Sequence, residues 1–140
     1  MVESINEQTS GVFIIAATPF TEDGSVDTAS AESLVEFYID KGVSGMTVLG
    51  MMGEAPKLAA DEADTFMRHM VRRVDARVPV IVGVSDAGIG NLARLAKSSM
   101  DAGAAGVMVA PASDLNTGKK IHNYFAQVFD ALGPDIPVCY

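Results

Sequence analysis

Short apolar runs alternate with helical patterns along nearly the whole chain, and this alternation limits the possible folds more than any other feature. Five runs have the apolar and β-branched content of strands buried on both faces: 11–20, 46–49, 78–84, 107–110 and 136–140. Between them, apolar residues recur at helical spacing. Strands that alternate with helices through short loops predict a parallel sheet built from right-handed βαβ units. The predicted class is therefore α/β.

Four helices are predicted between these runs. Asp27 can cap the first, which Gly42 ends, and Thr117 can cap the last. The second should run from about Asp61 to Arg77, with acidic residues in its first turn and arginines near its end, as the helix dipole favours. Its predicted buried stripe is Ala63, Phe66, Met67, Met70, Val71 and Val74. A third helix around Leu92, Leu95 and Met100 should stop at Gly103.

Charge and composition exclude several classes of protein. Among the 140 residues, 49% are hydrophobic, which is ample for a core, and the net charge is −8 with only ten scattered Lys and Arg. Nucleic-acid binding needs clustered basic residues, so it is not expected. Cys139 is the only cysteine, and neither a signal peptide nor a membrane-length apolar run is visible. We therefore expect a soluble, cytoplasmic protein that does not bind membranes.

Two architectures fit the alternation. A doubly wound open sheet of five strands would be complete at this length. A (β/α)₈ barrel needs about 250 residues, and this chain supplies four βα units and a fifth strand. A faint internal repeat, in which 41–48 resembles 102–109, suggests a doubled βαβα module. Periodicity alone leaves both architectures open.

The glycine-flanked turn Gly50-Met51-Met52-Gly53-Glu54, which follows the second run, is the first candidate site. Glycine lets the main chain approach a ligand closely, and a strand that ends in such a turn can present backbone N–H groups to a small anion. This loop is predicted to bind a substrate carboxylate.

Several short motifs, in order and at matching spacing, carry a family resemblance. They are Thr18-Pro19-Phe20 with Asp23-Gly24, Gly50-x-x-Gly53-Glu54, Pro79-Val80-Ile81-Val82-Gly83, Ala102-Gly103-Ala104 with Pro111, and Ile136-Pro137-x-x-Tyr140. With them, residues 11–140 resemble the N-terminal half of the dihydrodipicolinate synthase and N-acetylneuraminate lyase family of pyruvate-dependent class I aldolases. The resemblance implies a TIM barrel, a homotetramer, and no metal or organic cofactor.

The resemblance also implies roles for particular residues. Active sites of such barrels gather at the C-terminal ends of the strands. The Gly50–Gly53 loop, including Met51 and Met52, would hold the carboxylate of pyruvate or another 2-keto acid, with Thr18 nearby. Tyr140 would relay protons to the Schiff base, although without the resemblance it would be taken as the aromatic end of a core strand. Glu54 is expected to hold the loop by accepting backbone N–H bonds rather than to transfer protons.

Two departures from the family pattern bear on the substrate. Where the synthase has two threonines inside the glycine loop, this chain has Met51 and Met52, whose thioethers cannot relay a proton. Where the synthase has a tyrosine pair after strand four, this chain reads Pro111-Ala112-Ser113-Asp114. Both departures argue against dihydrodipicolinate synthesis and favour a different 2-keto acid or aldehyde.

The Schiff-base lysine is not present in this chain. In the family it ends strand six, whereas the lysines here fall on predicted helices or loops: Lys41, Lys57, Lys97, Lys119 and Lys120. We therefore expect residues 1–140 to form a single incomplete barrel domain, with 1–10 as an N-terminal tail, and the chain alone to be inactive. The alternatives are a non-catalytic relative or fragment, and an open-sheet domain that binds a small ligand. His69 and His122 lack partners at metal-ligand spacing, so no metal site is expected.

Overall fold

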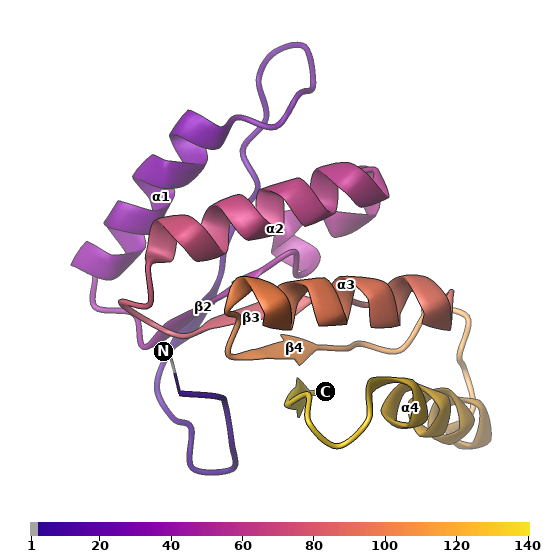
Figure 1. Ribbon diagram of the computed structural model, residues 1–140. Coiled ribbons are helices and arrows are strands. Elements are labelled where there is room, and N and C mark those ends of the chain that lie inside the picture. The colour runs from indigo at the N-terminus through magenta and orange to yellow at the C-terminus, as the bar shows by residue number, and fades with distance from the viewer. Residues whose placement is uncertain (1–2) are drawn as a thin grey trace.

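Five parallel strands form one sheet in the computed structural model, which describes residues 3–140 (Figure 1). The strands are β1 (Phe13–Ile15), β2 (Gly45–Val48), β3 (Val80–Gly83), β4 (Gly106–Met108) and β5 (Val138–Cys139). The helices are α1 (Thr28–Asp40), α2 (Ala60–Val74), α3 (Ile89–Ala102) and α4 (Gly118–Leu132). Two short 3₁₀ turns, η1 (Met51–Gly53) and η2 (Ala55–Lys57), lie between β2 and α2.

The strand order decides between the two architectures. The sheet runs β1-β2-β3-β4-β5 in sequence order, and each pair is parallel. A doubly wound sheet reverses its strand order at a switch point and carries helices on both faces. Here α1 packs on α2, α2 on α3 and α3 on α4, so the helices follow one another around one face of the sheet. The open-sheet interpretation is therefore wrong, and the chain forms the first part of a (β/α)₈ barrel wall.

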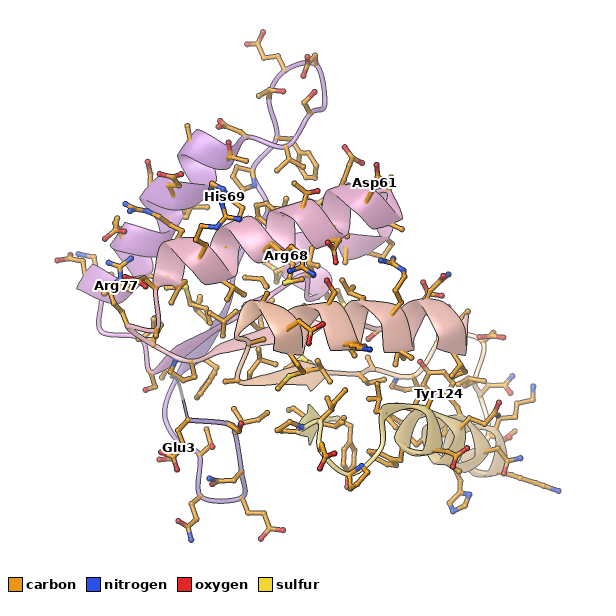
Figure 2. The ribbon with its side chains drawn as sticks, in the orientation of Figure 1. Glu3, Asp61, Arg68, His69, Arg77 and Tyr124 are labelled. Atoms are coloured by element: carbon orange, nitrogen blue, oxygen red, sulfur yellow. The ribbon has the colours of Figure 1, made fainter. Side chains whose placement is uncertain are left out.

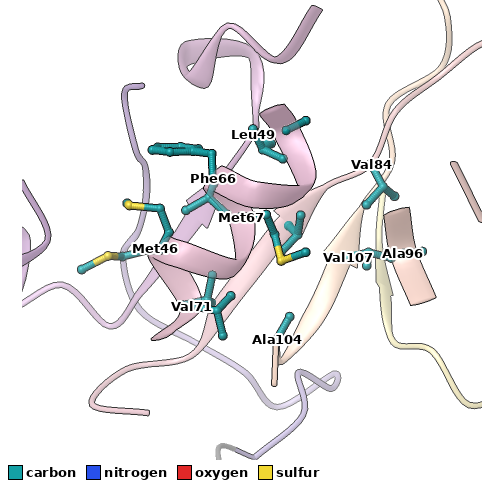
Figure 3. Close-up of a cluster of buried hydrophobic side chains, with 14 of the residues drawn as sticks. Met46, Leu49, Phe66, Met67, Val71, Val84, Ala96, Ala104 and Val107 are labelled. Carbon is teal, nitrogen blue, oxygen red and sulfur yellow. The ribbon is translucent and has the colours of Figure 1, made fainter. Parts of the chain in front are cut away.

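Helix α2 packs against the sheet through the predicted stripe. All six stripe residues are buried, and Figure 3 shows Phe66, Met67 and Val71 among the side chains of the core. Ala59 cannot cap the helix with its side chain, but its own N–H donates to Glu62 at 2.9 Å. The helix ends at Val74, before the predicted Arg77, because the next two residues adopt left-handed φ angles.

The first apolar run forms a much shorter strand than predicted. Of residues 11–20, only Phe13–Ile15 pair with β2, and none of these three side chains is fully buried. Gly11 turns the backbone at φ 110°, and Val12 is largely exposed. Strand β1 is at the edge of the described sheet, so it has a partner on one side only. Within residues 3–140, the predicted run is therefore a strand of only three residues.

The segment predicted as an N-terminal tail is attached to the barrel wall from residue 5 onwards. The Ile5 N–H donates to the Ala105 carbonyl at 2.9 Å, just before β4. A Cβ at Gly106 would lie 2.6 Å from the Ile5 side chain, so the close approach of the two segments depends on this glycine. The segment thus covers the amino-terminal ends of the strands.

The inner face of the sheet is hollow. A cavity of about 500 Å³ is lined by Phe13, Ile15, Thr47, Ile81 and Met108, together with residues of the N-terminal segment. Thr47 is fully buried, and its hydroxyl has no hydrogen-bond partner among residues 3–140. This is the face that a closed barrel would fill with side chains from all its strands.

A polar cluster joins α2 to α3 on the outside of the sheet. Arg68, labelled in Figure 2, donates from Nε to Asp64 Oδ2 at 3.0 Å and from Nη2 to Ser98 Oγ at 2.6 Å. The Ser98 hydroxyl also donates to Asp64. The Ser98 hydrogen bond is the largest of the causes that lower the pKa of Asp64, and Arg68 adds to it.

Replacing Asp64 with asparagine should therefore destabilise the fold at neutral pH, by about 1–2 kcal/mol for a hydrogen-bonded charged group. A carboxyl whose pKa is lowered by folding stabilises the protein above its unfolded pKa, and that contribution is lost as the pH falls through the folded pKa. The stability difference between wild type and variant should accordingly shrink below about pH 4. Urea unfolding of both proteins across this range measures it, and a difference independent of pH would contradict the assignment.

Candidate active site

The C-terminal ends of the strands bring together most of the residues singled out in the sequence. Because all five strands are parallel, the segments that follow them lie at one end of the sheet. Thr18 follows β1, the Gly50–Glu54 turn follows β2, Ser85 follows β3 and Pro111 follows β4. This end is the candidate active site.

The turn after β2 presents two unoccupied backbone donors. Its internal bonds run from the Gly53 N–H to the Gly50 carbonyl at 3.0 Å and from the Glu54 N–H to the Met51 carbonyl at 3.1 Å. No acceptor within residues 3–140 takes the N–H groups of Met51 and Met52. Both begin the 3₁₀ turn η1, where the first amides of a helical segment have no internal partner. They can therefore donate to a ligand.

The side chains of Met51 and Met52 stand away from the protein. Met51 is 90% exposed and Met52 66%. Within residues 3–140, neither side chain is part of the packed core. The two thioethers offer a ligand apolar contact but no strong hydrogen bond.

Thr18 is bound to this turn from the neighbouring strand. Its side chain is 5% exposed, and Oγ1 donates to the Gly53 carbonyl at 2.6 Å. Gly53 lies close to the same segment, because a Cβ there would be 3.2 Å from the Ala16 carbonyl oxygen. The hydroxyl oxygen of Thr18 keeps acceptor capacity, but its proton is used within the protein.

The carboxylate of Glu54 has a different partner from the backbone N–H groups predicted for it. Its carboxylate pairs with the ammonium of Lys57 and accepts no backbone N–H bond within the described chain. Its backbone is left-handed, with φ at 52°, and forms the junction between η1 and η2. Thr18, not Glu54, supplies the side-chain hydrogen bond that holds the turn.

Tyr140 is not brought to the turn. Its ring packs against Phe125 and Phe129 of α4, with ring centroids 5.5 and 5.9 Å apart, and the residue is 82% exposed. Cys139 pairs with Met108, whose side chain lines the inner hollow. Alternation along the strand therefore directs Tyr140 to the helix side. Its role as a proton relay therefore stays a prediction.

Two further side chains fix the loops of this face. Ser85 Oγ accepts the Ala110 N–H at 2.8 Å and so ties the end of β3 to the end of β4. Tyr124, labelled in Figure 2, donates its hydroxyl to the Asp86 carbonyl at 3.0 Å. Burial, and then the charge of Asp86, raise the pKa of Tyr124. The sequence carries no signal for this hydrogen bond.

No lysine of the described chain follows a strand. Lys97, Lys119 and Lys120 lie on helices, Lys41 follows α1, and Lys57 is in η2 beside Glu54. His69 of α2 faces Glu32 of α1 at 3.2 Å on the outside of the barrel wall. Within residues 3–140, no three His, Cys, Asp or Glu side chains are grouped as metal ligands, and no helix is long and apolar enough to cross a membrane.

Similar proteins share both the sequence and this architecture. The sequence profile of the dihydrodipicolinate synthetase family matches residues 8–138. A 4-hydroxy-tetrahydrodipicolinate synthase of Ralstonia nicotianae is 32% identical over 132 residues, 94% of this chain and 44% of its own length. One of Sorangium cellulosum is 40% identical over 101 residues, 71% of this chain and 34% of its own length. The chain therefore spans less than half the length of these relatives.

Solved structures agree with the sequence matches. A dihydrodipicolinate synthase from Rhodopseudomonas palustris is 46% identical, with a TM-score of 0.91 over 97% of this chain and 45% of that one. YagE of E. coli K12, a prophage protein of the dihydrodipicolinic acid synthase family solved in complex with pyruvate, is 31% identical, with a TM-score of 0.83 over 94% of this chain and 44% of that one. The chain belongs to the dihydrodipicolinate synthetase family, of which it covers the N-terminal part of the barrel.

Proposed function

We propose that this chain contributes the carboxylate-binding part of a class I aldolase or lyase that acts on pyruvate or another 2-keto acid through a Schiff base. The observation that carries the proposal is the pair of unoccupied amides, Met51 and Met52, at the C-terminal face of the sheet. Hydrogen bonds to an ionised group are stronger than those between neutral groups, and backbone donors held in a turn need no reorganisation. The relative solved with pyruvate supports this ligand class.

The Schiff-base lysine would come from the part of the barrel that these relatives have beyond the matched region. The amine must lose its proton before it attacks the ketone, which a desolvated pocket promotes. A proton relay by Tyr140 would require its ring to leave Phe125 and Phe129.

The proposal also concerns the second substrate, which is the compound that reacts with the keto acid. The relatives described above are named synthases, so the comparisons give no support to the exclusion of dihydrodipicolinate synthesis. That exclusion rests on Met51, Met52 and the sequence Pro111–Asp114 alone. We retain it as a proposal, with a more apolar 2-keto acid or aldehyde as the partner, because the exposed thioethers offer apolar contact. A cytoplasmic homotetramer that needs no metal or organic cofactor remains part of the same proposal.

Borohydride reduction in the presence of pyruvate tests the chemistry. With protein expressed from the complete gene, hydride should reduce the imine carbon and leave a stable secondary amine on one lysine. Mass spectrometry should then find the adduct on a lysine outside residues 1–140. No adduct with pyruvate or any other 2-keto acid would exclude a Schiff-base mechanism.

The second candidate is a non-catalytic relative or fragment, which is favoured by the absence of a strand-end lysine from residues 3–140. Sequencing the complete gene separates the two. A lysine about one βα unit after Tyr140 favours the enzyme, whereas a gene without one favours the non-catalytic relative. Native mass spectrometry of the same protein reports its oligomeric state.

A further inference from the structure

Leu49 has an unusual backbone conformation immediately before the carboxylate-binding turn. Its φ is 56°, in the left-handed region that is unfavourable for a residue with a Cβ, and its side chain is 3% exposed. Such strain persists only where the surrounding structure imposes it. The conformation turns the chain out of β2, so that Met51 and Met52 begin η1 with their amides unoccupied.

Gly83, at the end of β3, makes room for this turn. A Cβ on Gly83 would lie 2.2 Å from the Leu49 carbonyl oxygen, 2.7 Å from its carbonyl carbon and 3.1 Å from the Gly50 nitrogen. All three are backbone atoms, so no side-chain rotation could relieve the contact. Any larger residue at position 83 would push the Leu49–Gly50 peptide away from β3.

Thr18 holds the other end of the turn from the opposite side. Its hydrogen bond to the Gly53 carbonyl, at 2.6 Å, comes from the segment that follows β1. The turn is therefore fixed between β1 and β3, two strands that are not neighbours in the sheet. Leu49, Gly83 and Thr18 therefore all act on the segment that carries the free amides of Met51 and Met52.

From this geometry we infer that Leu49, Gly83 and Thr18 are positioning residues that aim the Met51 and Met52 amides at a substrate carboxylate. The inference rests on the proposed function. None of the three needs to touch the substrate, because they act through the peptide groups of the turn. Their effect should therefore depend on whether the ligand has a carboxylate.

Two carbonyl compounds and two glycine variants separate this role from general damage. Pyruvate has the carboxylate, and hydroxyacetone replaces it with a neutral hydroxymethyl group. In Gly83→Ala, made in the protein from the complete gene, the pyruvate concentration for half-maximal borohydride trapping should rise about tenfold or more, as for the loss of one charged hydrogen bond. Trapping of hydroxyacetone should stay within about twofold, the spread allowed for unrelated surface changes. The control is Gly90→Ala, because a Cβ at Gly90 in α3 meets nothing within 4 Å.

Parallel losses for both compounds in a folded Gly83→Ala protein, or no loss for either, would overturn the inference. If Gly83→Ala does not fold, Thr18→Val keeps the side-chain shape, removes the hydrogen bond to Gly53, and should show the same carboxylate-selective loss. If the wild type traps neither compound, the proposed function fails, and a crystal structure of Gly83→Ala tests the positioning by itself. In that structure, the φ of Leu49 should no longer lie in the left-handed region. An unchanged φ at Leu49 would refute the positioning role of Gly83.

Discussion

Replacing Met51 with proline should raise the pyruvate concentration needed for half-maximal trapping about ten- to a hundredfold, the cost of one hydrogen bond to a charged group. Proline removes the amide hydrogen at the first position of η1, where a helical segment tolerates it best. Gly50 has φ −75° and ψ −171°, an extended conformation of the kind that precedes proline. The variant thus deletes a donor while the turn can keep its shape.

Met51→Leu is the matched control for this variant. It keeps the amide and the apolar character of an exposed side chain, so half-maximal trapping should stay within about twofold of wild type. Circular dichroism verifies that both variants are folded. If the leucine variant loses as much as the proline variant, the thioether rather than the amide contacts the substrate, and the carboxylate-binding role of this backbone is wrong.

Replacing Leu92 with alanine should lower the free energy of unfolding by about 2–5 kcal/mol. Leu92 is completely buried on α3, in the core between the helices and the sheet, so its truncation leaves a cavity that packed neighbours fill only partly. Urea denaturation of the protein from the complete gene measures the loss. The effect should be among the largest of any single truncation on this helix.

Phe37→Ala provides the comparison for Leu92→Ala. Phe37 lies on α1 and is 54% exposed, in contact with Tyr38 and Lys41. Despite its larger side chain, its truncation should cost about 1 kcal/mol or less, since exposed positions have little burial to lose. Equal losses at the two sites would mean that the core is not packed between α3 and the sheet as described.

The helices could be predicted closely because each carries its own periodic signal. The six stripe residues of α2 are all buried, and Thr117 and Gly103 act at helix ends as their residue types indicate. Strand β1 is shorter than predicted because an apolar run does not reveal how many of its residues pair with a neighbouring strand. The end of α2 was missed because Asp75 and Ala76, unlike glycine, give no signal of a left-handed turn.

The candidate site was only partly visible in the sequence. Glycine spacing located the turn at Gly50–Gly53, but hydrogen-bond partners are set by tertiary contacts. Glu54 therefore pairs with Lys57 where backbone acceptance was predicted, and Thr18 supplies the support instead. In the sequence, Leu49 looks like an ordinary strand residue, and nothing indicates its left-handed backbone. Only the structure shows that position 83 must be glycine, because a Cβ there would meet the Leu49 backbone.

A crystal structure of the protein from the complete gene with bound pyruvate would show directly which groups bind the carboxylate. The carboxylate should accept hydrogen bonds from the backbone nitrogens of Met51 and Met52, each at about 2.7–3.2 Å. Pyruvate bound at this face with its carboxylate held elsewhere, and both amides still unoccupied, would contradict this prediction.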